Sequence, residues 1–593
     1  MGIIKLLVIF LVGIHICLGS NVSESNVSKE SVCKKCMDLI EGFESSVLGA
    51  NLMGKYIEPV LLKLCNLYAD PETCKGTLKL MAPLIYENLI KKTLNPRKVC
   101  NSFFICPKEY WMKDNFDEYA KKILADKPPK NIPVPKKHSI YKAVHFSDIH
   151  ADMDYLPGSN ANCNAFICCH KESGTPVTPK DAAKYWGSNE KCAVPYRTIE
   201  QAIKSVADFV KPELIIWTGD TANQDMWEHK NETQLIPTKI VTEYFTKYLP
   251  NSIIIPIFGN HDVFPNGNYK FHGMHWMHKE LVKYWGPLIG EEAKKELEHQ
   301  GFYSVYHKSY NLRFIALNTE ACDAYNFNVL SIEKDPEEQL IWLHKTLLRA
   351  EMNKEDVIII GHVPPGDDTC SEEWSKRYCV LVERFQNIIR GQFFGHTHMS
   401  EVSLQKSYDK KDTIGLAVIT PSFTPSRATK LSYDGATDFS VYDFDRDTNS
   451  LTNIYIYRML LSEANSKLAT QPPLWSMLYD YLSEYDLKDL SLESMVEFSN
   501  KLKKGSPYLK KYVNNYKVRL PWEWNNDKMI AKKHIAQFIF CQVSTGIYED
   551  FAKCMGANLL YMLFEKPSPQ AGLPTTIFWI IQKALGKWHQ HSK

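Results

Sequence analysis

Short apolar runs, each followed by polar residues, recur through the middle of this chain. They lie at residues 141–146, 214–218, 253–258, 314–317, 357–360, 393–394 and 416–419. Runs of this length, rich in β-branched and aromatic residues, are typical of buried strands, and helical spacing at 198–210 and 337–350 separates some of them. The pattern predicts an α/β sandwich. Two later runs, at 439–444 and 454–457, have no helical pattern between them, so we expect them to pair antiparallel.

The N-terminal part follows a different pattern. Six cysteines stand at positions 33, 36, 65, 74, 100 and 106, and the apolar residues between them recur at helical spacing. We expect several short amphipathic helices joined by disulfides, with a pairing that the spacing leaves open. Four prolines among residues 127–137 then predict a semi-rigid extended linker, which marks a domain boundary.

Helical patterns return after about residue 460, for example at 475–481 and 492–502. Cys541 and Cys554 are spaced as a local disulfide would require. A last apolar stretch, 575–585, is short and is interrupted by Gln582 and Lys583. We interpret it as an amphipathic helix packed on the core, with peripheral membrane contact as the alternative.

Composition narrows the class of protein. A chain of 593 residues is too long for one hydrophobic core, and 44% hydrophobic with 23% charged residues is typical of a globular protein. Its 70 Lys and Arg against 68 Asp and Glu leave a formal net charge of +2 and no long run of one sign. We therefore expect no nucleic-acid partner.

The sixteen cysteines indicate an oxidising compartment. Residues 1–19 combine Lys5, an apolar run at 6–16 and small residues at the cleavage positions, which predicts a signal peptide. A membrane anchor is the alternative, but the run is shorter than the ~20 residues that span a bilayer. We expect no transmembrane segment. Loss of Cys17 leaves an odd number of cysteines, and glycosylation acceptors at Asn21, Asn26 and Asn231 fit the secretory route.

Five polar clusters follow the apolar runs. They are Ser147-Asp148-Ile149-His150, Gly219-Asp220, Gly259-Asn260-His261-Asp262, Gly361-His362 and Gly395-His396-Thr397-His398. Taken singly, each is more often a polar turn than a ligand. Residues just beyond strand ends line the ligand-binding crevice of an α/β sheet, so we expect the clusters to converge. Asp, Asn and His in this arrangement predict a metal site, since the two members of Asp148/His150 or of His396/His398 can point to one side.

The order of these clusters resembles the calcineurin-like metallophosphoesterase superfamily over about residues 140–460. The resemblance implies a four-layer α/β/β/α sandwich with two metal ions. One ion would be held by Asp148, His150, Asp220 and His398, and the other by Asp220, Asn260, His362 and His396, with Asp220 bridging. Such ligands suit Zn, Fe or Mn, and a secreted, redox-inert site favours two Zn²⁺ ions. His261 would then stabilise the transition state or protonate the leaving oxygen.

Over the whole mature chain the arrangement resembles the acid sphingomyelinase family. It implies a saposin-like domain at 31–110, a linker at 111–138, a catalytic domain at 139–460 and a helical C-terminal domain at 461–593. For residues 31–110 the alternative is an unrelated small helical domain with disulfides. The implied disulfides are Cys33–Cys106, Cys36–Cys100, Cys65–Cys74, Cys163–Cys168, Cys169–Cys192, Cys322–Cys370 and Cys541–Cys554. Cys379 is left over.

The same resemblance implies hydrolysis of sphingomyelin to ceramide and phosphocholine, by in-line attack of a hydroxide that bridges two zinc ions. The saposin-like domain would present membrane lipid, and anionic lipid surfaces would be partners of a monomer that is secreted or lysosomal. Two alternatives remain: a secreted phosphodiesterase acting on nucleotides or other soluble phosphodiesters, and a lipid-binding protein with a disabled enzyme core.

At four places the sequence departs from the motifs of related phosphoesterase families. Asn223 stands where purple acid phosphatases carry a Tyr ligand, and residues 219–225 lack the protein-phosphatase motif. Gln224 stands where the acid sphingomyelinase family usually has a second His, and Gln cannot act as an acid, which places more weight on His261. The family's Asn-Pro-Gly-Tyr stretch is replaced around residues 435–439.

Overall fold

The computed structural model describes most of the chain from residue 116 onward and part of the N-terminal segment. The described residues are 34, 38, 58–66, 70–84, 116–136, 138–165, 167–188, 191–225, 229–323, 326–329, 335–425, 435–467, 471–502, 505–515 and 533–556. The signal peptide, Asn21, Asn26, Cys33, Cys36, Cys100, Cys106 and the stretch 575–585 lie outside them. The chain divides into two compact units, Met1–Tyr119 and Ala120–Lys593, and this division falls within the segment expected to be a linker.

Two helices of the first unit are described, α4 (Glu58–Cys65) and α5 (Pro71–Leu84). Asp70 begins α5, because its carboxylate accepts hydrogen bonds from the backbone N–H groups of Glu72 and Thr73 at 3.1 and 3.0 Å. The buried face of α5 includes Cys74, Leu78 and Met81, which recur at helical spacing. A disulfide joins Cys65 to Cys74, so this pair agrees with the resemblance.

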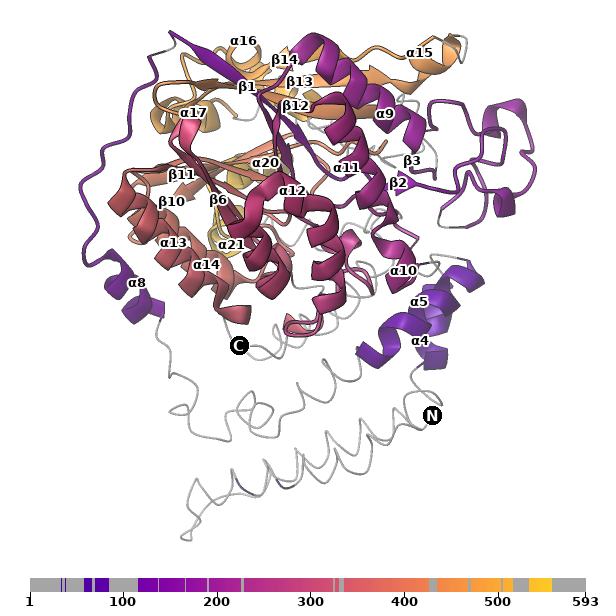
Figure 1. Cartoon of the computed structure of the whole chain (residues 1–593), viewed down its shortest axis with the longest axis horizontal. Helices are drawn as coiled ribbons and strands as arrows, with labels where there is room; N and C mark the ends of the chain where they lie inside the picture. The colour runs from indigo at the N-terminus through magenta and orange to yellow at the C-terminus, as the bar shows by residue number, and fades with distance from the viewer. Residues whose placement is uncertain are drawn as a thin grey trace. The chain divides into compact units, whose positions relative to one another are not determined.

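The second unit contains two six-stranded mixed sheets (Figure 1). The first has the order β14 (Ser476–Asp480), β13 (Leu451–Leu460), β12 (Ala436–Asp445), β1 (Ile140–Phe146), β4 (Leu214–Trp217), β5 (Ile253–Pro256). Its β1, β4 and β5 strands are parallel. The other pairs are antiparallel, including the predicted pair of β12 and β13.

The second sheet has the order β10 (Glu401–Lys406), β11 (Thr413–Ile419), β9 (Ile389–Phe394), β8 (Asp356–Ile360), β7 (Leu312–Ala316), β6 (Tyr303–His307). Its four inner strands are parallel, and the two edge strands run antiparallel to their neighbours. A small parallel pair, β2 (Ala151–Asp152) and β3 (Val194–Pro195), follows β1. The two mixed sheets place the carboxyl ends of several strands close to one another.

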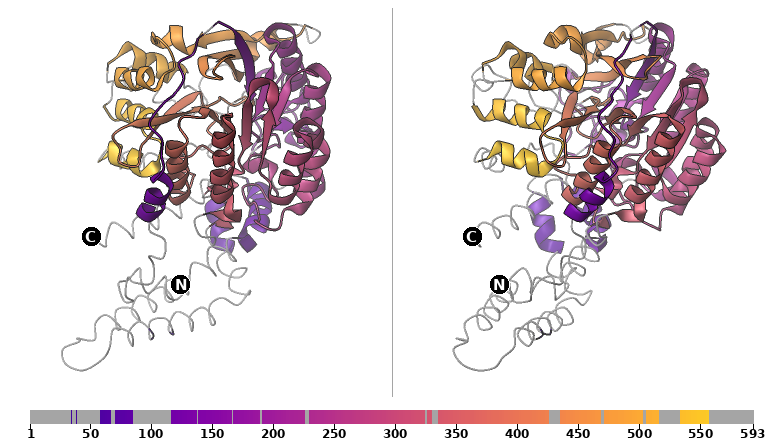
Figure 2. Two further views of the ribbon diagram at one scale, coloured as in Figure 1. Left: turned by 60° about the vertical axis from the view of Figure 1, so that its left-hand side comes forward. Right: turned by 90° about the vertical axis from the view of Figure 1, so that its left-hand side faces the viewer.

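Helices cover the outer side of both sheets (Figure 2). The described helices from residue 116 onward are α8 (Phe116–Leu124), α9 (Tyr196–Ser205), α10 (Asn231–Gln234), α11 (Ile236–Tyr248), α12 (His275–Gln300), α13 (Gln339–Asn353), α14 (Glu372–Arg384), α15 (Leu461–Ser466), α16 (Tyr481–Tyr485), α17 (Leu492–Lys501), α18 (Pro507–Asn515), α20 (Lys533–Ser544) and α21 (Tyr548–Met555), and only some of them contact a sheet. Helix α12 contacts both β5 of the first sheet and β6 of the second, and α13, α14, α17 and α20 pack on the second sheet. The predicted layer order, helices, sheet, sheet, helices, is confirmed.

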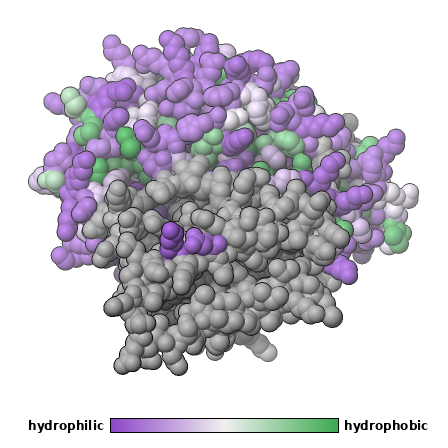
Figure 3. Space-filling model, turned by 90° about the horizontal axis from the view of Figure 1, so that it is seen from below, coloured by the Kyte–Doolittle hydropathy of each residue, from purple (hydrophilic) through white to green (hydrophobic). Residues whose placement is uncertain are grey.

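The core lies between the sheets and under the helices. Phe393 of β9 meets Tyr442 of β12 with 4.8 Å between ring centroids, and Phe444 at 5.9 Å. All four residues of β4 are buried, which explains why this strand is a continuous apolar run. On the face shown in Figure 3 the described surface is mostly hydrophilic, with hydrophobic residues in small separate groups, as on ordinary protein surfaces.

The proline-rich segment is extended and contacts the C-terminal end of α14 and the residues that follow it. Lys127 pairs with Glu383 at 2.6 Å, and Asp126 pairs with Arg384 at 2.9 Å. The side chain of Asn387 also donates to the Pro129 carbonyl at 2.7 Å. No helix or strand is assigned between residues 127 and 136, as the proline content predicts.

One helical prediction is wrong. Residues 476–480 of the stretch 475–481 form β14, the edge strand of the first sheet, paired antiparallel with β13. Trp475 and Tyr479 are buried, and the Trp475 indole N–H donates to the Thr437 hydroxyl at 3.0 Å. Pairing with β13 satisfies the backbone groups of this segment, so tertiary contact overrides the local helical spacing.

Candidate metal centre

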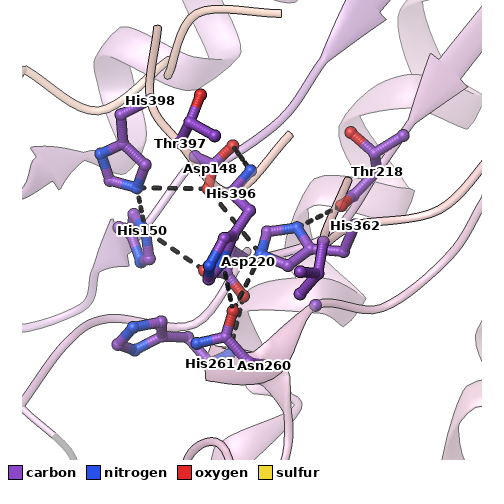
Figure 4. A network of polar contacts seen from close by, with 12 residues as sticks. Asp148, His150, Thr218, Asp220, Asn260, His261, His362, His396, Thr397 and His398 are labelled. Carbon is purple, nitrogen blue, oxygen red and sulfur yellow. Dashed lines mark hydrogen bonds and ion pairs between the residues drawn. The ribbon is translucent and has the colours of Figure 1, made fainter. Parts of the chain in front are cut away.

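All five polar clusters meet at the carboxyl ends of strands from both sheets (Figure 4). Asp148 and His150 follow β1, and Asp220 follows β4. Asn260 and His261 follow β5, His362 follows β8, and His396 and His398 follow β9. The convergence that the sequence predicts is therefore present, and both sheets contribute to it.

The backbone is unusual at these positions. Asp148, Asp220, His396 and His398 have φ values of 51°, 52°, 72° and 63°, in the left-handed region that L-residues rarely adopt. Such a residue costs roughly 1–3 kcal/mol, and strained positions of this kind cluster at functional sites. The strain turns each side chain out of its strand and toward the common centre.

Two glycines permit the close approach of the ligand loops. A Cβ atom on Gly259 would lie 2.3 Å from Asp220 Oδ1, and one on Gly395 would lie 1.9 Å from Ser147 Oγ. Any side chain at either position would push the neighbouring loop away.

One group of ligand atoms surrounds His398. Its Nε2 lies 3.2 Å from Asp148 Oδ1 and 3.2 Å from His150 Nε2. Nδ1 of His150 lies 2.9 Å from the Ala222 carbonyl. Because a carbonyl only accepts, Nδ1 carries the hydrogen, and the lone pair of neutral His150 is on Nε2, which faces the group. Asp220 Oδ2 lies 3.7 Å from the same Nε2 atom.

A second group surrounds His362. Its Nε2 lies 3.2 Å from Asp220 Oδ2 and 2.9 Å from Asn260 Oδ1, while Nδ1 donates to the Thr218 carbonyl at 2.7 Å. Nδ1 of His396 lies 3.0 Å from the same Asn260 oxygen. Asp148 Oδ1 reaches His362 Nε2 at 4.0 Å.

Both Asp148 and Asp220 lie between the two groups of ligand atoms. By mutual distance, one metal-sized group is Asp148, His150 and His398, and the other is Asp148, Asp220 and His362. Asp148 is therefore common to both, whereas the resemblance gave the bridging position to Asp220. Asp220 lies between the two groups as well, through its contacts with both His150 and His362.

Hydrogen-bond acceptors face one another across this site. Asp148 Oδ1 is buried and accepts no hydrogen bond from the part of the chain that the structure describes. The lone pairs of His150 and His362 also face carboxylate or amide oxygens. A cation satisfies such a set, and mixed imidazole and carboxylate ligands fit a divalent transition metal. The residues present thus fit the metal that their order implies.

Electrostatics favour ionised carboxylates at this site, and these carboxylates in turn favour positive charge on His362. Burial would raise the pKa of the Asp148 carboxyl, but the neighbouring His398 outweighs it and the pKa falls below its usual value. His362 likewise lowers the pKa of Asp220. Burial lowers the pKa of His150 to about 3, whereas the Asp220 carboxylate raises that of His362 to about 10 against the effect of burial. The site holds ionised carboxylates and attracts positive charge.

His261 lies at the edge of the group. Its backbone N–H donates to Asp220 Oδ1 at 2.7 Å, and its ring meets the His150 ring edge-on at 4.9 Å. The Asn266 amide donates to Nδ1 at 3.0 Å, so the hydrogen of neutral His261 is on Nε2. Gln234 donates to Asn266 Oδ1 at 3.3 Å, which sets the direction of that amide. Burial lowers the pKa of His261 and favours the neutral ring.

Several supporting residues were not anticipated from the sequence. Asp262 accepts hydrogen bonds from the backbone N–H groups of Gly259, Thr221 and Ala222 at 2.8–3.0 Å, which ties the loops after β4 and β5 together. Thr369 Oγ1 lies 3.1 Å from His396 Nε2 and donates to Asp367 Oδ1 at 2.7 Å. The GNHD context could have indicated Asp262, but no local signal marks Thr369.

The structure also describes the cysteines of the second unit, the glycosylation acceptor Asn231 and Gln224. Disulfides join Cys163 to Cys168, Cys169 to Cys192, Cys322 to Cys370 and Cys541 to Cys554. Cys379 is a free, buried thiol. Asn231 is exposed at the start of α10, and Gln224 is partly buried beside Asn223. These four disulfides are the pairs that the resemblance implies.

The fold and the ligand set define a calcineurin-like phosphoesterase. Residues 141–400 match the family model described as "Calcineurin-like phosphoesterase", and residues 412–560 match "Acid sphingomyelin phosphodiesterase C-terminal region". A sphingomyelin phosphodiesterase of Bos taurus is 31% identical over 455 residues, which cover 73% of this chain and 70% of that protein. The chain belongs to the sphingomyelin phosphodiesterase family, which confirms the resemblance drawn from its motifs.

Two further relatives agree. Sphingomyelin phosphodiesterase of Homo sapiens is 30% identical over 445 residues, covering 72% of this chain and 68% of that protein. Sphingomyelin phosphodiesterase A of Dictyostelium discoideum is 29% identical over 517 residues, covering 82% and 84%. Among the described helices, none is both long and apolar enough to cross a membrane.

Proposed function

We propose that this protein is a zinc-dependent phosphodiesterase that hydrolyses sphingomyelin to ceramide and phosphocholine. The observation that carries the proposal is the pair of ligand groups, joined by Asp148 and Asp220, in a chain related to sphingomyelin phosphodiesterases along most of its length. Family membership supports the substrate, and the buried carboxylate oxygen Oδ1 of Asp148, which faces the ring nitrogens of His398 and His362, supports the metal.

The metal ligands are assigned to two sites. Asp148, His150, Asp220 and His398 would hold one Zn²⁺ ion, and Asp220, Asn260, His362 and His396 would hold the second. Hydrogen bonds to Ala222, Thr218 and Thr369 hold three of the four histidines in the tautomer that each site needs. When bound, two such ions activate water and polarise phosphoryl oxygens.

His261 supplies the proton-donating group. Its Nε2–H is free to hydrogen-bond an oxygen of the substrate phosphate, because Nδ1 is occupied by Asn266. In the reaction the bond between phosphorus and the ceramide oxygen breaks, an oxygen from water takes its place, and the ceramide oxygen gains a proton. In the overall balance that proton comes from the attacking water. Gln224 cannot act as an acid, so His261 stabilises, through its Nε2–H, the charge that develops on the phosphate or on the leaving oxygen.

We infer that the first unit serves lipid access. The disulfide-linked pair α4 and α5 supports the saposin-like interpretation, and saposin-like helices loosen lipid packing so that a headgroup can reach the catalytic site. The protein would act as a secreted or lysosomal monomer on anionic lipid surfaces. Exposure of Asn231 supports glycosylation at that position.

A direct test combines metal analysis with product release. We expect the purified full-length protein to contain two zinc ions per chain and to release phosphocholine from sphingomyelin vesicles, whereas Asp148→Asn abolishes both. Surface variant Asp409→Asn serves as the matched control, since Asp409 is exposed and its carboxylate bonds Ser407 and Lys411 in its own turn. Turnover of soluble nucleotide phosphodiesters without turnover of vesicles would favour the alternative function.

A further inference from the structure

We propose that His145, a buried histidine that belongs to none of the ligand clusters, is a positioning residue for the metal centre. It lies on β1, three residues before Asp148, and contacts no metal ligand in the described structure. The inference concerns metal binding, so it rests on the proposed zinc sites but not on the identity of the substrate.

His145 occupies the apolar layer between the two sheets. Its side chain is fully buried (0% exposed), and its ring meets the Phe393 ring of the opposite sheet edge-on at 6.1 Å. An imidazole in such surroundings is unfavourable unless both nitrogens are hydrogen-bonded. Nδ1 is bonded to Tyr442 Oη at 2.9 Å, and Nε2 is bonded to Thr218 Oγ1 at 2.8 Å.

This histidine does not act through charge. Burial lowers the pKa of His145 to about 3, which favours the neutral ring. A neutral imidazole has one donor and one acceptor nitrogen, and here each has a single partner on a different strand. The ring therefore joins β12, through Tyr442, to the end of β4, through Thr218.

Thr218 passes this restraint to the ligand His362. The Thr218 carbonyl accepts the hydrogen bond from His362 Nδ1 at 2.7 Å (Figure 4), and its hydroxyl is the atom bonded to His145. Its backbone N–H donates to the Phe146 carbonyl at 3.1 Å. Thr218 is thus held at three points, and the direction of its carbonyl determines which nitrogen of His362 faces the metal.

The other ligand histidines are oriented differently. His150 is bonded to the Ala222 carbonyl and His396 to the Thr369 hydroxyl, both in loops at the site itself. For His362, the orienting carbonyl is held from inside the core between the sheets. The ligand Asp220 follows Thr218 by two residues, so a shift of Thr218 disturbs two ligands at once.

The test is zinc affinity of the full-length protein, measured by competition with a chromogenic chelator. We expect His145→Phe, which fills the space but removes both hydrogen bonds, to weaken zinc binding by about 10-fold, the lower range for removal of an orienting partner. Thr218→Val removes only the hydroxyl and should give a similar loss. The double variant should lose no more zinc affinity than either single variant, because both variants remove the same hydrogen bond between His145 and Thr218.

Tyr442→Phe is the matched control. It removes the other hydrogen-bond partner of His145, so it should lower thermal stability while zinc affinity stays close to that of the wild type. Wild-type zinc affinity in His145→Phe, or an equal loss in Tyr442→Phe, would overturn the proposal. If His145→Phe does not fold, Thr218→Val decides: unchanged zinc binding in that variant overturns the proposal, and weakened binding supports it. A wild-type protein that bound no zinc would overturn the proposed cofactor first.

Discussion

At the metal centre, hydrogen bonds from the surrounding chain decide which nitrogen of each histidine faces the ligand group. The ligands themselves could be predicted, because Asp148, Asp220 and the four histidines stand in a recognisable order after apolar runs. The hydrogen-bond partners of these histidines could not be predicted. Thr369 is 27 residues away from His396 in the sequence, and folding brings its hydroxyl to 3.1 Å from that ring. Asn266 belongs to none of the five clusters, and its amide lies 3.0 Å from His261.

Removal of the Thr369 hydroxyl tests this dependence. In Thr369→Val the His396 Nε2–H loses its acceptor, so we expect metal affinity to fall by about 10-fold with little change in thermal stability. Thr452→Val is the control, because the hydroxyl of Thr452, on β13, donates to the Asp443 carbonyl of β12 and not to a ligand. Equal zinc affinities in the two variants would contradict the role of Thr369.

His261 is expected to act on the substrate and not on the metal. His261→Ala should lower kcat by roughly 10²–10³-fold, the usual loss for one transition-state donor, while zinc content stays unchanged. His261→Gln keeps an N–H donor of similar reach and should recover part of the activity. Full turnover by His261→Ala would refute the assignment.

Among the elements, strands buried along most of their length were the most predictable, including the edge strand β5, and strands with polar or exposed residues were the least. β1, β4, β5 and β8 bury nearly every residue, so each is a continuous apolar run that local sequence reveals. β6 and β10 lie at edges of the second sheet and contain several polar residues, so they carry no comparable signal. β14 was mistaken for a helix because its apolar residues include Met477 and Leu478, which are exposed.

One ion pair makes an element near the site dependent on pH. His170, in the disulfide-linked segment after β2, lies 3.0 Å from Asp152 of β2. Burial opposes its charge, but the Asp152 carboxylate raises the pKa of His170 to about 9. A raised folded-state pKa means that the stabilisation is complete below the unfolded value near 6.5 and is lost as the pH rises through 9.

We therefore expect the stability difference between the wild type and His170→Gln to depend on pH. The wild type should be more stable at pH 6, and the difference should shrink by pH 10. Denaturant unfolding at pH 6, 8 and 10 measures it. His272→Gln is the control, since His272 is exposed. A difference that is constant over this range would show that the pair is not charged.

For the whole molecule, separation into two units implies separate roles. The first unit holds Cys65 and Cys74, whereas the metal ligands all belong to the second. The double variant Cys65→Ser/Cys74→Ser should lower phosphocholine release from sphingomyelin vesicles while turnover of a soluble short-chain substrate is retained. The analogous variant of Cys541 and Cys554, in the second unit, is the control. Equal losses on both substrates would argue against a lipid-presenting role.

Net charge predicts how the protein meets a lipid surface. The chain has a formal charge of +2 with 19 histidines neutral, and exposed histidines gain charge below pH 6.5. Binding to anionic vesicles should be stronger at pH 5 than at pH 7, and vesicles of neutral lipid should show a smaller difference. Equal binding to anionic vesicles at both pH values would contradict this prediction.

By itself, the sequence determined the class of fold, the order of the metal-binding clusters and the family, because strand burial and ligand spacing are local properties of the chain. Tertiary structure decided that Asp148 belongs to both ligand groups, that residues 476–480 form a strand, and that His145 holds the end of β4. These features depend on atoms brought together across strands and sheets. Distances of that kind have no counterpart in the linear pattern of residues.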